Sequence, residues 1–124
     1  MVLGIGIDII EVSRIKSATM RRKKFLDNIY APEEIRLSER GEFRYEELAG
    51  RFAAKEAFFK AIKTGWRQGV KFNEVVVLNE KSGAPYIKLK GRTAEIARTL
   101  SIKEIFVSIS HTKDLAVGVV VITN

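Results

Sequence analysis

Two carboxylates occupy positions where a folded chain rarely places an acid. Asp8 ends the apolar run 2–7, and Glu56 lies within the crowded, largely apolar segment 51–62. An ionised carboxylate in apolar surroundings costs free energy unless a cation or hydrogen-bond donors compensate it. Two such acids with lysines nearby indicate a site that holds a divalent metal ion and a highly phosphorylated ligand.

The segment around Glu56 has the pattern of a buried helix that carries further charges. At about 100° per residue, Glu56, Lys60 and Lys63 fall within one narrow arc, and apolar side chains cover most of the remainder. A simple ion pair between Glu56 and Lys60 is the structural alternative, worth only about 0.2–0.5 kcal/mol if exposed. Asp8 changes this balance, because a second acid would repel Glu56 unless a cation lay between them. Oxygen ligands favour Mg²⁺, and the sequence has no His/Cys cluster that would favour zinc.

The only histidine, His111, lies in the polar turn 110–113 between two apolar segments. A lone histidine is more often structural than catalytic. In this turn, however, imidazole, hydroxyl and amine donors stand side by side and would suit a phosphate group.

Basic residues gather in one short segment of a chain with net charge +7 and a pI near 9.8. Only Glu11 and Asp27 flank this cluster, whose members are Arg14, Lys16, Arg21, Arg22, Lys23 and Lys24. Such a surface suits an anionic partner, and a nucleic acid, a membrane surface, an acidic protein and a polyphosphate all qualify. A solvated helix face is the plainer interpretation.

The composition of the 124 residues predicts one domain over 1–124, with 46% apolar and 30% charged residues. No apolar stretch is long enough to cross a bilayer, and the run 2–10 is typical of a strand rather than a signal peptide. The absence of cysteine excludes disulfides, thiolate metal sites and cysteine nucleophiles, and it favours a cytoplasmic location.

Hydrophobic periodicity and turn residues predict an α+β fold, with a mainly antiparallel sheet of about five strands packed on a long central helix. Strands are expected at 2–9 (a buried one), 74–78, 86–90, 105–110 and 115–122. Helices are expected at 13–29 with Ser13 as N-cap, at 32–38, at 43–63 with Gly65 as the stop, and at 93–100. Gly50 either weakens the central helix or lets another backbone approach. The pair Gly4 and Gly6 lacks the third glycine of a dinucleotide fingerprint, which excludes a Rossmann site.

Three segments together resemble the signature of the phosphopantetheinyl transferases. They are GIGIDIIE at 4–11, RFAAKEAFFKA at 51–61 and SISHT at 108–112. Each block alone is weak, but all three in this order and at these separations are specific. The small size and the Ser-His-Thr turn resemble the holo-acyl-carrier-protein synthase branch of this family, and the likeness extends over the whole chain except for a departure at 64–70.

The resemblance implies an enzyme that moves the 4′-phosphopantetheine arm of coenzyme A to a serine of apo-acyl carrier protein. Adenosine 3′,5′-bisphosphate is released, Mg²⁺ is required, and the product serves fatty acid biosynthesis. By this likeness Asp8 and Glu56 bind the metal and act in catalysis with Lys60, which contacts the pyrophosphate. Arg51, His111 and Thr112 match positions at the nucleotide end, including its 3′-phosphate.

The same resemblance assigns the basic helix to docking of the acidic carrier protein. Arg14 matches a docking position, and Arg21, Arg22 and Lys24 are expected to assist. A homotrimer with each site at a subunit interface is also implied. Lys55 belongs to the motif without a clear role, and the base is left open between Glu56 and a metal-bound water relayed through a carboxylate.

Two other functions fit parts of the pattern. A metal-dependent phosphohydrolase or nuclease would use the same paired acids, with water in place of a partner serine. A nucleic-acid-binding module would explain the basic pI, but the aromatic residues follow core stripes and are not interleaved with the basic residues. Neither nucleic acid nor membrane is therefore expected as a partner.

Overall fold

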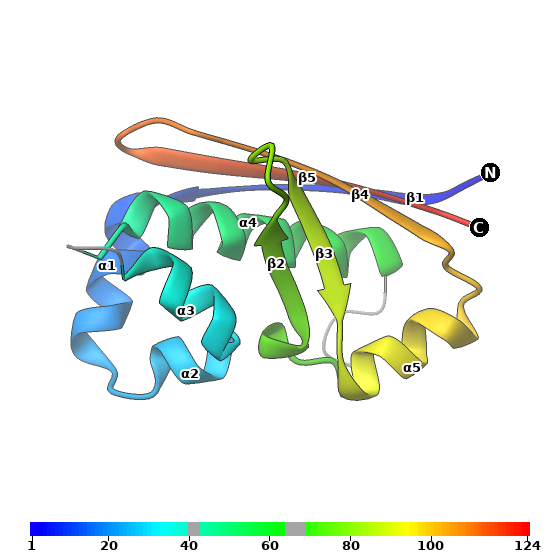
Figure 1. Ribbon diagram of the computed structural model, residues 1–124, viewed down its shortest axis with the longest axis horizontal. Helices are drawn as coiled ribbons and strands as arrows, with labels where there is room; N and C mark the ends of the chain where they lie inside the picture. Colours follow the sequence, from blue (N-terminus) through cyan, green and yellow to red (C-terminus); the bar gives the residue numbers. More distant parts are fainter. Residues whose placement is uncertain (40–42, 64–68) are drawn as a thin grey trace.

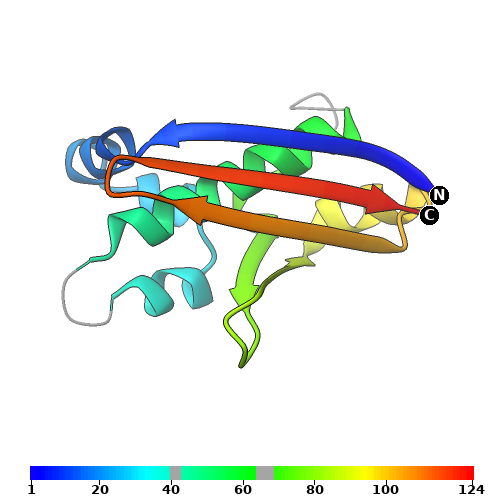
Figure 2. The same ribbon diagram turned by 90° about the horizontal axis from the view of Figure 1, so that it is seen from above.

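The computed structural model describes residues 1–39, 43–63 and 69–124. A long helix, α4 (Tyr45–Ile62), lies at the centre of the molecule. A three-stranded sheet covers one side of this helix, and smaller helices and a hairpin cover the other (Figures 1 and 2). Both termini lie at one end of the sheet, and the first helix lies at the opposite end (Figure 1).

The five expected strands are present, but they form two antiparallel sheets rather than one. The larger has the order β1-β5-β4 and the smaller pairs β2 with β3. The strands are β1 (Val2–Glu11), β2 (Val75–Asn79), β3 (Pro85–Leu89), β4 (Glu104–His111) and β5 (Leu115–Thr123). The helices besides α4 are α1 (Val12–Arg21), α2 (Phe25–Ile29), α3 (Pro32–Ser38), α5 (Gly91–Thr99) and the 3₁₀ turn η2 (Phe72–Glu74). The α+β class is therefore confirmed.

The expected helix 13–29 is wrong in its extent, because the chain forms two helices there. Helix α1 begins at Val12 directly after β1, so Ser13 lies in its first turn and is not the N-cap. The backbone becomes extended at Arg22 before α2 begins. A continuous helix would turn Phe25 away from the face that buries Ile15, since ten residues at about 100° each leave the two some 80° apart. The break lets α2 pack Phe25 against the core.

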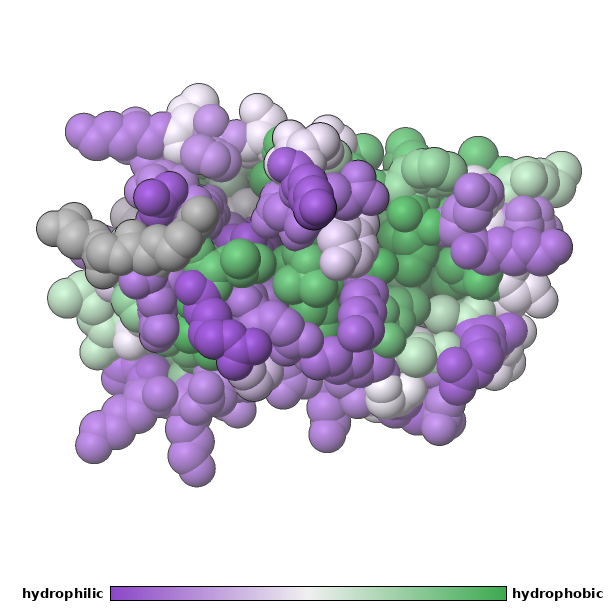
Figure 3. Space-filling model, in the orientation of Figure 1, coloured by the Kyte–Doolittle hydropathy of each residue, from purple (hydrophilic) through white to green (hydrophobic). Residues whose placement is uncertain are grey.

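Strand β1 is buried on one face only, so the expectation of a buried strand holds for that face and is wrong for the other. Gly4 and Gly6 face α4, whereas Ile5, Ile7 and Ile9 are exposed at 66%, 59% and 62%. The sequence hides this alternation because the outward positions carry isoleucine instead of a polar residue. Hydrophobic surface is also visible at the upper right edge of the molecule and across its middle, at the level of α4 (Figure 3).

Glycines let the large sheet lie directly on the backbone of α4. A Cβ atom at Gly6 would lie 1.9 Å from the Ala57 carbonyl oxygen, and one at Gly4 would lie 2.1 Å from that of Ala61. Helix α4 is buried nearly all round, as its composition predicts. The helix ends at Ile62, where Lys63 adopts a left-handed conformation with φ 63°. Gly65, the expected stop, lies outside the described residues.

Gly50 serves a different contact from the one expected. The group nearest to it is the side chain of Ile109 on β4, whose Cγ2 would lie 2.8 Å from an added Cβ, and not a backbone. Among the described residues, no helix is long and apolar enough to span a membrane.

Candidate active site

The strand β1 and the helix α4 bring three of the predicted site residues together. Lys60 on α4 donates hydrogen bonds from Nζ to the Asp8 carboxylate at 3.0 Å and to the carbonyl oxygen of Ile7 at 2.9 Å. The Lys60 side chain is 53% exposed and that of Asp8 19%, so this cluster is open to solvent on one side. The glycine contacts described above set the short distance between the two backbones.

Glu56 completes this carboxylate cluster one helical turn before Lys60. Burial raises the pKa of Glu56 above its ordinary value, the negative charge of Asp8 raises it further, and Lys60 acts in the opposite direction. The two acids therefore lie close enough to repel each other within one chain. Lys60 bonds Asp8 and offsets part of this repulsion, and a bound cation would offset it further.

The donor set of this cluster fits Mg²⁺. Within the described ranges no group of three or more His, Cys, Asp or Glu side chains is available to a metal. Two carboxylates that leave the remaining positions to water and substrate phosphates are a usual arrangement for Mg²⁺. Asp8 and Glu56 would supply these two oxygen donors.

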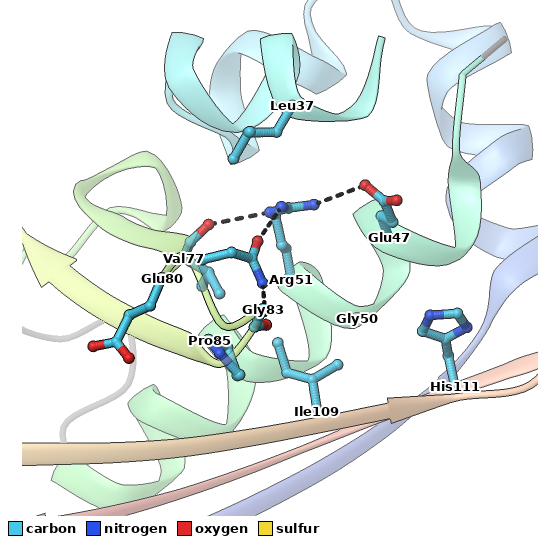
Figure 4. Close-up of a pocket in the computed structure, with 11 residues that line it drawn as sticks. Leu37, Glu47, Gly50, Arg51, Val77, Glu80, Gly83, Pro85, Ile109 and His111 are labelled. Atoms are coloured by element: carbon cyan, nitrogen blue, oxygen red, sulfur yellow. Dashed lines mark hydrogen bonds and ion pairs between the residues drawn. The ribbon is translucent and has the colours of Figure 1, made fainter. Parts of the chain in front are cut away.

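A separate cleft of about 560 Å³ opens on the other side of α4, and it contains two further predicted residues, Arg51 and His111. Its walls come from α3, α4, β4 and the β2–β3 hairpin (Figure 4). Asp8, Glu56 and Lys60 do not line it. The predicted site residues thus form two groups on one chain, the carboxylate cluster and this cleft.

Arg51 forms part of the cleft wall and is itself almost fully buried. Its guanidinium donates from Nε to the carbonyl oxygen of Val77 at 3.1 Å, from Nη2 to Asn79 Oδ1 at 2.9 Å and from Nη1 to Ser38 Oγ at 3.2 Å. Nη1 also lies 3.7 Å from the Glu47 carboxylate (Figure 4). Arg51 therefore joins the helix to the hairpin as well as presenting positive charge to the cleft.

His111 and Thr112 stand at the turn between β4 and β5. His111 is exposed at the end of β4 and lines the cleft. The Thr112 hydroxyl accepts hydrogen bonds from the backbone N–H groups of Asp114 at 3.3 Å and Leu115 at 3.1 Å, which order the turn. Thr112 does not line the cleft on this chain.

The predicted docking residues lie on or next to α1, which follows β1 directly. They are exposed, and they are Arg14, Arg21, Arg22 and Lys24. Asp8 is on the strand that leads directly into α1, and Arg14, in the first turn of α1, follows it by six residues.

Sequence reasoning missed the hairpin wall of the cleft and the partner of Lys55. The wall includes Val77, Asn79 and Gly83, and the only signal was a glycine-containing turn that indicated a hairpin without a function. Lys55 is fully buried and pairs with Glu34 at 2.8 Å. Burial lowers the pKa of Lys55 to about 8, against the opposing effect of the Glu34 carboxylate.

A family model described as the 4′-phosphopantetheinyl transferase superfamily matches residues 4–120. The chain belongs to this family. It is 46% identical over 118 residues to a holo-[acyl-carrier-protein] synthase of Clostridium tetani, covering 95% of this chain and 93% of the relative. A protein of the same name from Solibacter usitatus is 43% identical over 125 residues and is matched over 100% of both chains.

Solved structures of this family have the same fold. The crystal structure of the synthase of Neisseria meningitidis gives a TM-score of 0.90 at 30% identity, with 100% of both chains covered. The Helicobacter pylori synthase in complex with coenzyme A gives a TM-score of 0.82 at 33% identity, covering 96% of this chain and 99% of that one. Membership of the transferase family, predicted from three short segments, is confirmed.

Proposed function

We propose that this chain transfers the 4′-phosphopantetheine arm of coenzyme A to a serine hydroxyl of apo-acyl carrier protein, within one domain over 1–124. The observation that carries the proposal is the convergence of Asp8, Glu56 and Lys60 from β1 and α4 in a chain with full-length synthase relatives. The reaction forms a bond between the serine oxygen and the phosphorus that bears the pantetheine. It breaks the bond from that phosphorus to the bridging oxygen, and adenosine 3′,5′-bisphosphate departs.

The carboxylate cluster is assigned to the diphosphate of coenzyme A. Asp8 and Glu56 would hold Mg²⁺, which would neutralise phosphate charge and polarise phosphorus. Lys60 lies 3.0 Å from Asp8 and adds a second positive charge where the leaving phosphate gains negative charge. The serine proton passes to a base, and Glu56, whose pKa is raised, is the candidate that this cluster offers.

The cleft is assigned to the nucleotide end of coenzyme A. Apolar side chains in it, such as Leu37, Pro85 and Ile109, suit the flat faces of a base. Arg51 and His111 supply positive or hydrogen-bonding groups for phosphate, and Thr112 extends this set at the neighbouring turn. The basic surface on and next to α1, with Arg14 as its main docking residue, is assigned to the acidic carrier protein and would speed the encounter.

A homotrimer in which neighbouring copies share each site is the assembly we propose, in the cytoplasm. The outer face of the β1-β5-β4 sheet supports association of copies, because it exposes large apolar side chains: Val2, Ile5, Ile7, Ile9, Phe106 and Leu115. The separation of the cleft from the carboxylate cluster on one chain agrees with a site completed by a neighbouring copy. The turn at 111–114 is then available to the neighbour's carboxylate cluster.

One assay tests the reaction. The purified chain is incubated with coenzyme A, Mg²⁺ and apo-acyl carrier protein, and the mass of the intact carrier is measured by mass spectrometry. The carrier should gain the mass of phosphopantetheine, and a carrier with its acceptor serine changed to alanine should not. Hydrolysis of coenzyme A without any gain by the carrier would instead indicate a phosphohydrolase.

A further inference from the structure

A buried ion pair with no part in the proposed chemistry lies next to the cleft, where one of its members bonds the cleft residue Val77. Lys55 on α4 and Glu34 on α3 are both 0% exposed, with Lys55 Nζ 2.8 Å from Glu34 Oε1. Nζ also donates to the carbonyl oxygens of Phe72, at 2.9 Å, and Val75. The ammonium group therefore has three acceptors, as a buried lysine requires.

Both oxygens of Glu34 are also occupied by backbone donors. Oε1 accepts from the N–H of Ala31 at 2.9 Å, where it closes the first turn of α3. Oε2 accepts from the N–H of Val77 on β2 at 3.0 Å. One carboxylate thus joins the start of α3, the helix α4 and the strand β2.

One edge of β2 pairs with β3, and side chains of α3 and α4 form the hydrogen bonds at its other edge. In the described part of the chain β2 pairs with β3 alone. Val77 directs its N–H to Glu34 and its carbonyl oxygen to Arg51, and Val75 directs its carbonyl oxygen to Lys55. Alternate residues of an antiparallel strand present both backbone groups to the same edge, and here that edge meets side chains of α3 and α4.

The bonded edge of β2 leads directly into the cleft. Val77 lines it, and the Arg51 guanidinium that completes the edge reaches Asn79 two residues further along. Leu37, on the helix that Glu34 anchors, forms the opposite wall. A shift of β2 relative to α4 would therefore change the spacing of the cleft walls and the hydrogen bonds that hold the Arg51 side chain. The strand β1 and the carboxylate cluster lie on the other side of α4.

We propose that the Glu34–Lys55 pair is a positioning device that fixes the edge of β2, and through it Arg51, at the spacing required by the nucleotide end of coenzyme A. The proposal rests on the function proposed above. It predicts an effect on coenzyme A binding that is separate from the transfer step, because Asp8, Glu56 and Lys60 lie on β1 and α4 and form no hydrogen bond to β2 in the described structure.

The test is a double variant, Glu34→Gln with Lys55→Met, which removes both charges at nearly constant volume. Removing one partner alone would leave a buried charge unpaired, whereas removing both is far less costly. We expect the KM for coenzyme A and the Kd for adenosine 3′,5′-bisphosphate to rise about tenfold or more, with kcat within about twofold of wild type. The KM for the carrier protein should not change.

A matched control removes a more exposed pair that joins α3 to the end of the same hairpin. Lys90, directly after β3, lies 2.8 Å from Glu33 on α3, with side chains 39% and 30% exposed. The double variant Glu33→Gln with Lys90→Met should leave both constants unchanged. The charge swap Glu34→Lys with Lys55→Glu should not restore binding, because a lysine at 34 cannot accept from the N–H of Val77.

Two results decide the matter. An unchanged KM and Kd in a folded double variant would overturn the inference while leaving the transferase intact. A wild-type chain that modifies no carrier would instead overturn the proposed function. If the double variant does not unfold cooperatively, the variant Glu34→Asp is used instead, with the same KM and Kd criteria. The shorter aspartate side chain cannot reach Lys55 and Val77 together.

Discussion

Replacement of Gly6 by alanine tests how closely β1 must approach α4. The added Cβ would lie 1.9 Å from the Ala57 carbonyl oxygen, 2.8 Å from its carbon and 3.0 Å from the Ala61 nitrogen. All three atoms belong to the backbone of a buried helix and cannot rotate away. Because Cβ contacts under 3.0 Å essentially do not occur, β1 must move from the helix by about 1.1 Å, the difference between 3.0 and 1.9 Å.

This displacement acts on stability and on catalysis. Overpacking of a rigid contact costs about 1–3 kcal/mol, and we expect the upper end of that range here. Asp8 moves with β1 and Lys60 stays with α4, so their 3.0 Å contact lengthens unless the lysine readjusts. A misplacement of about 1 Å in a catalytic group can cost about 10²-fold, and we expect a loss of that order in kcat/KM.

The assay combines thermal unfolding with steady-state transfer of phosphopantetheine to the carrier, measured well below the melting temperature. Gly69→Ala is the control: its φ of 76° makes alanine unfavourable there, but nothing lies within 4 Å of the added Cβ. This control should lose stability without a matching loss of kcat/KM. Wild-type melting temperature and activity in Gly6→Ala would refute the close contact between β1 and α4 and its role in the site.

Four further outcomes are expected. Glu56→Gln should raise the melting temperature of the metal-free protein at neutral pH, because a raised pKa means that the ionised form of Glu56 destabilises the fold. The difference in melting temperature between variant and wild type should vanish as the pH falls and Glu56 becomes protonated. Added Mg²⁺ should raise the melting temperature of wild type but not of Asp8→Ala or Glu56→Ala. Both variants should lose at least about 10²-fold in turnover, and a normal rate in either would contradict the metal assignment. Arg14→Glu should raise the KM for the carrier about tenfold, with a much smaller change for coenzyme A, and equal effects on both would remove the docking role. His111→Ala should weaken coenzyme A about tenfold but leave its analogue without the 3′-phosphate nearly unaffected, as measured by competition; equal weakening would count against a phosphate contact.

The sequence predicted most of the elements and the carboxylate cluster because both depend on local pattern. A strand that ends in an acid and a helix with Glu56 and Lys60 on one arc can be recognised from spacing alone. The approach of the two is also local in origin, since Gly4 and Gly6 alternate along β1 and the facing side of α4 is rich in alanine. Each pattern can be recognised within its own segment, although the contact between Lys60 and Asp8 joins residues 52 positions apart.

The remaining features depend on which distant segments meet. Glu34 has the position of an ordinary acid in the first turn of a helix, and no local pattern indicates that its partners include Lys55 and Val77. Arg51 likewise finds its acceptors 26 and 28 residues away on β2. The division of five strands into two sheets and the exposed isoleucines of β1 share this cause, because burial of a strand face is decided by what packs on it.

The side chains that bond the edge of β2 also protect this protein from aggregation. An unpaired strand edge is a template for pairing with other chains, and proteins commonly block such edges with charges or bulges. Here the block depends on a few ionic side chains of α3 and α4. Substitutions that remove Glu34 or Arg51 would release backbone donors and acceptors of a valine-rich strand, so aggregates should accumulate in such variants before the secondary structure is lost.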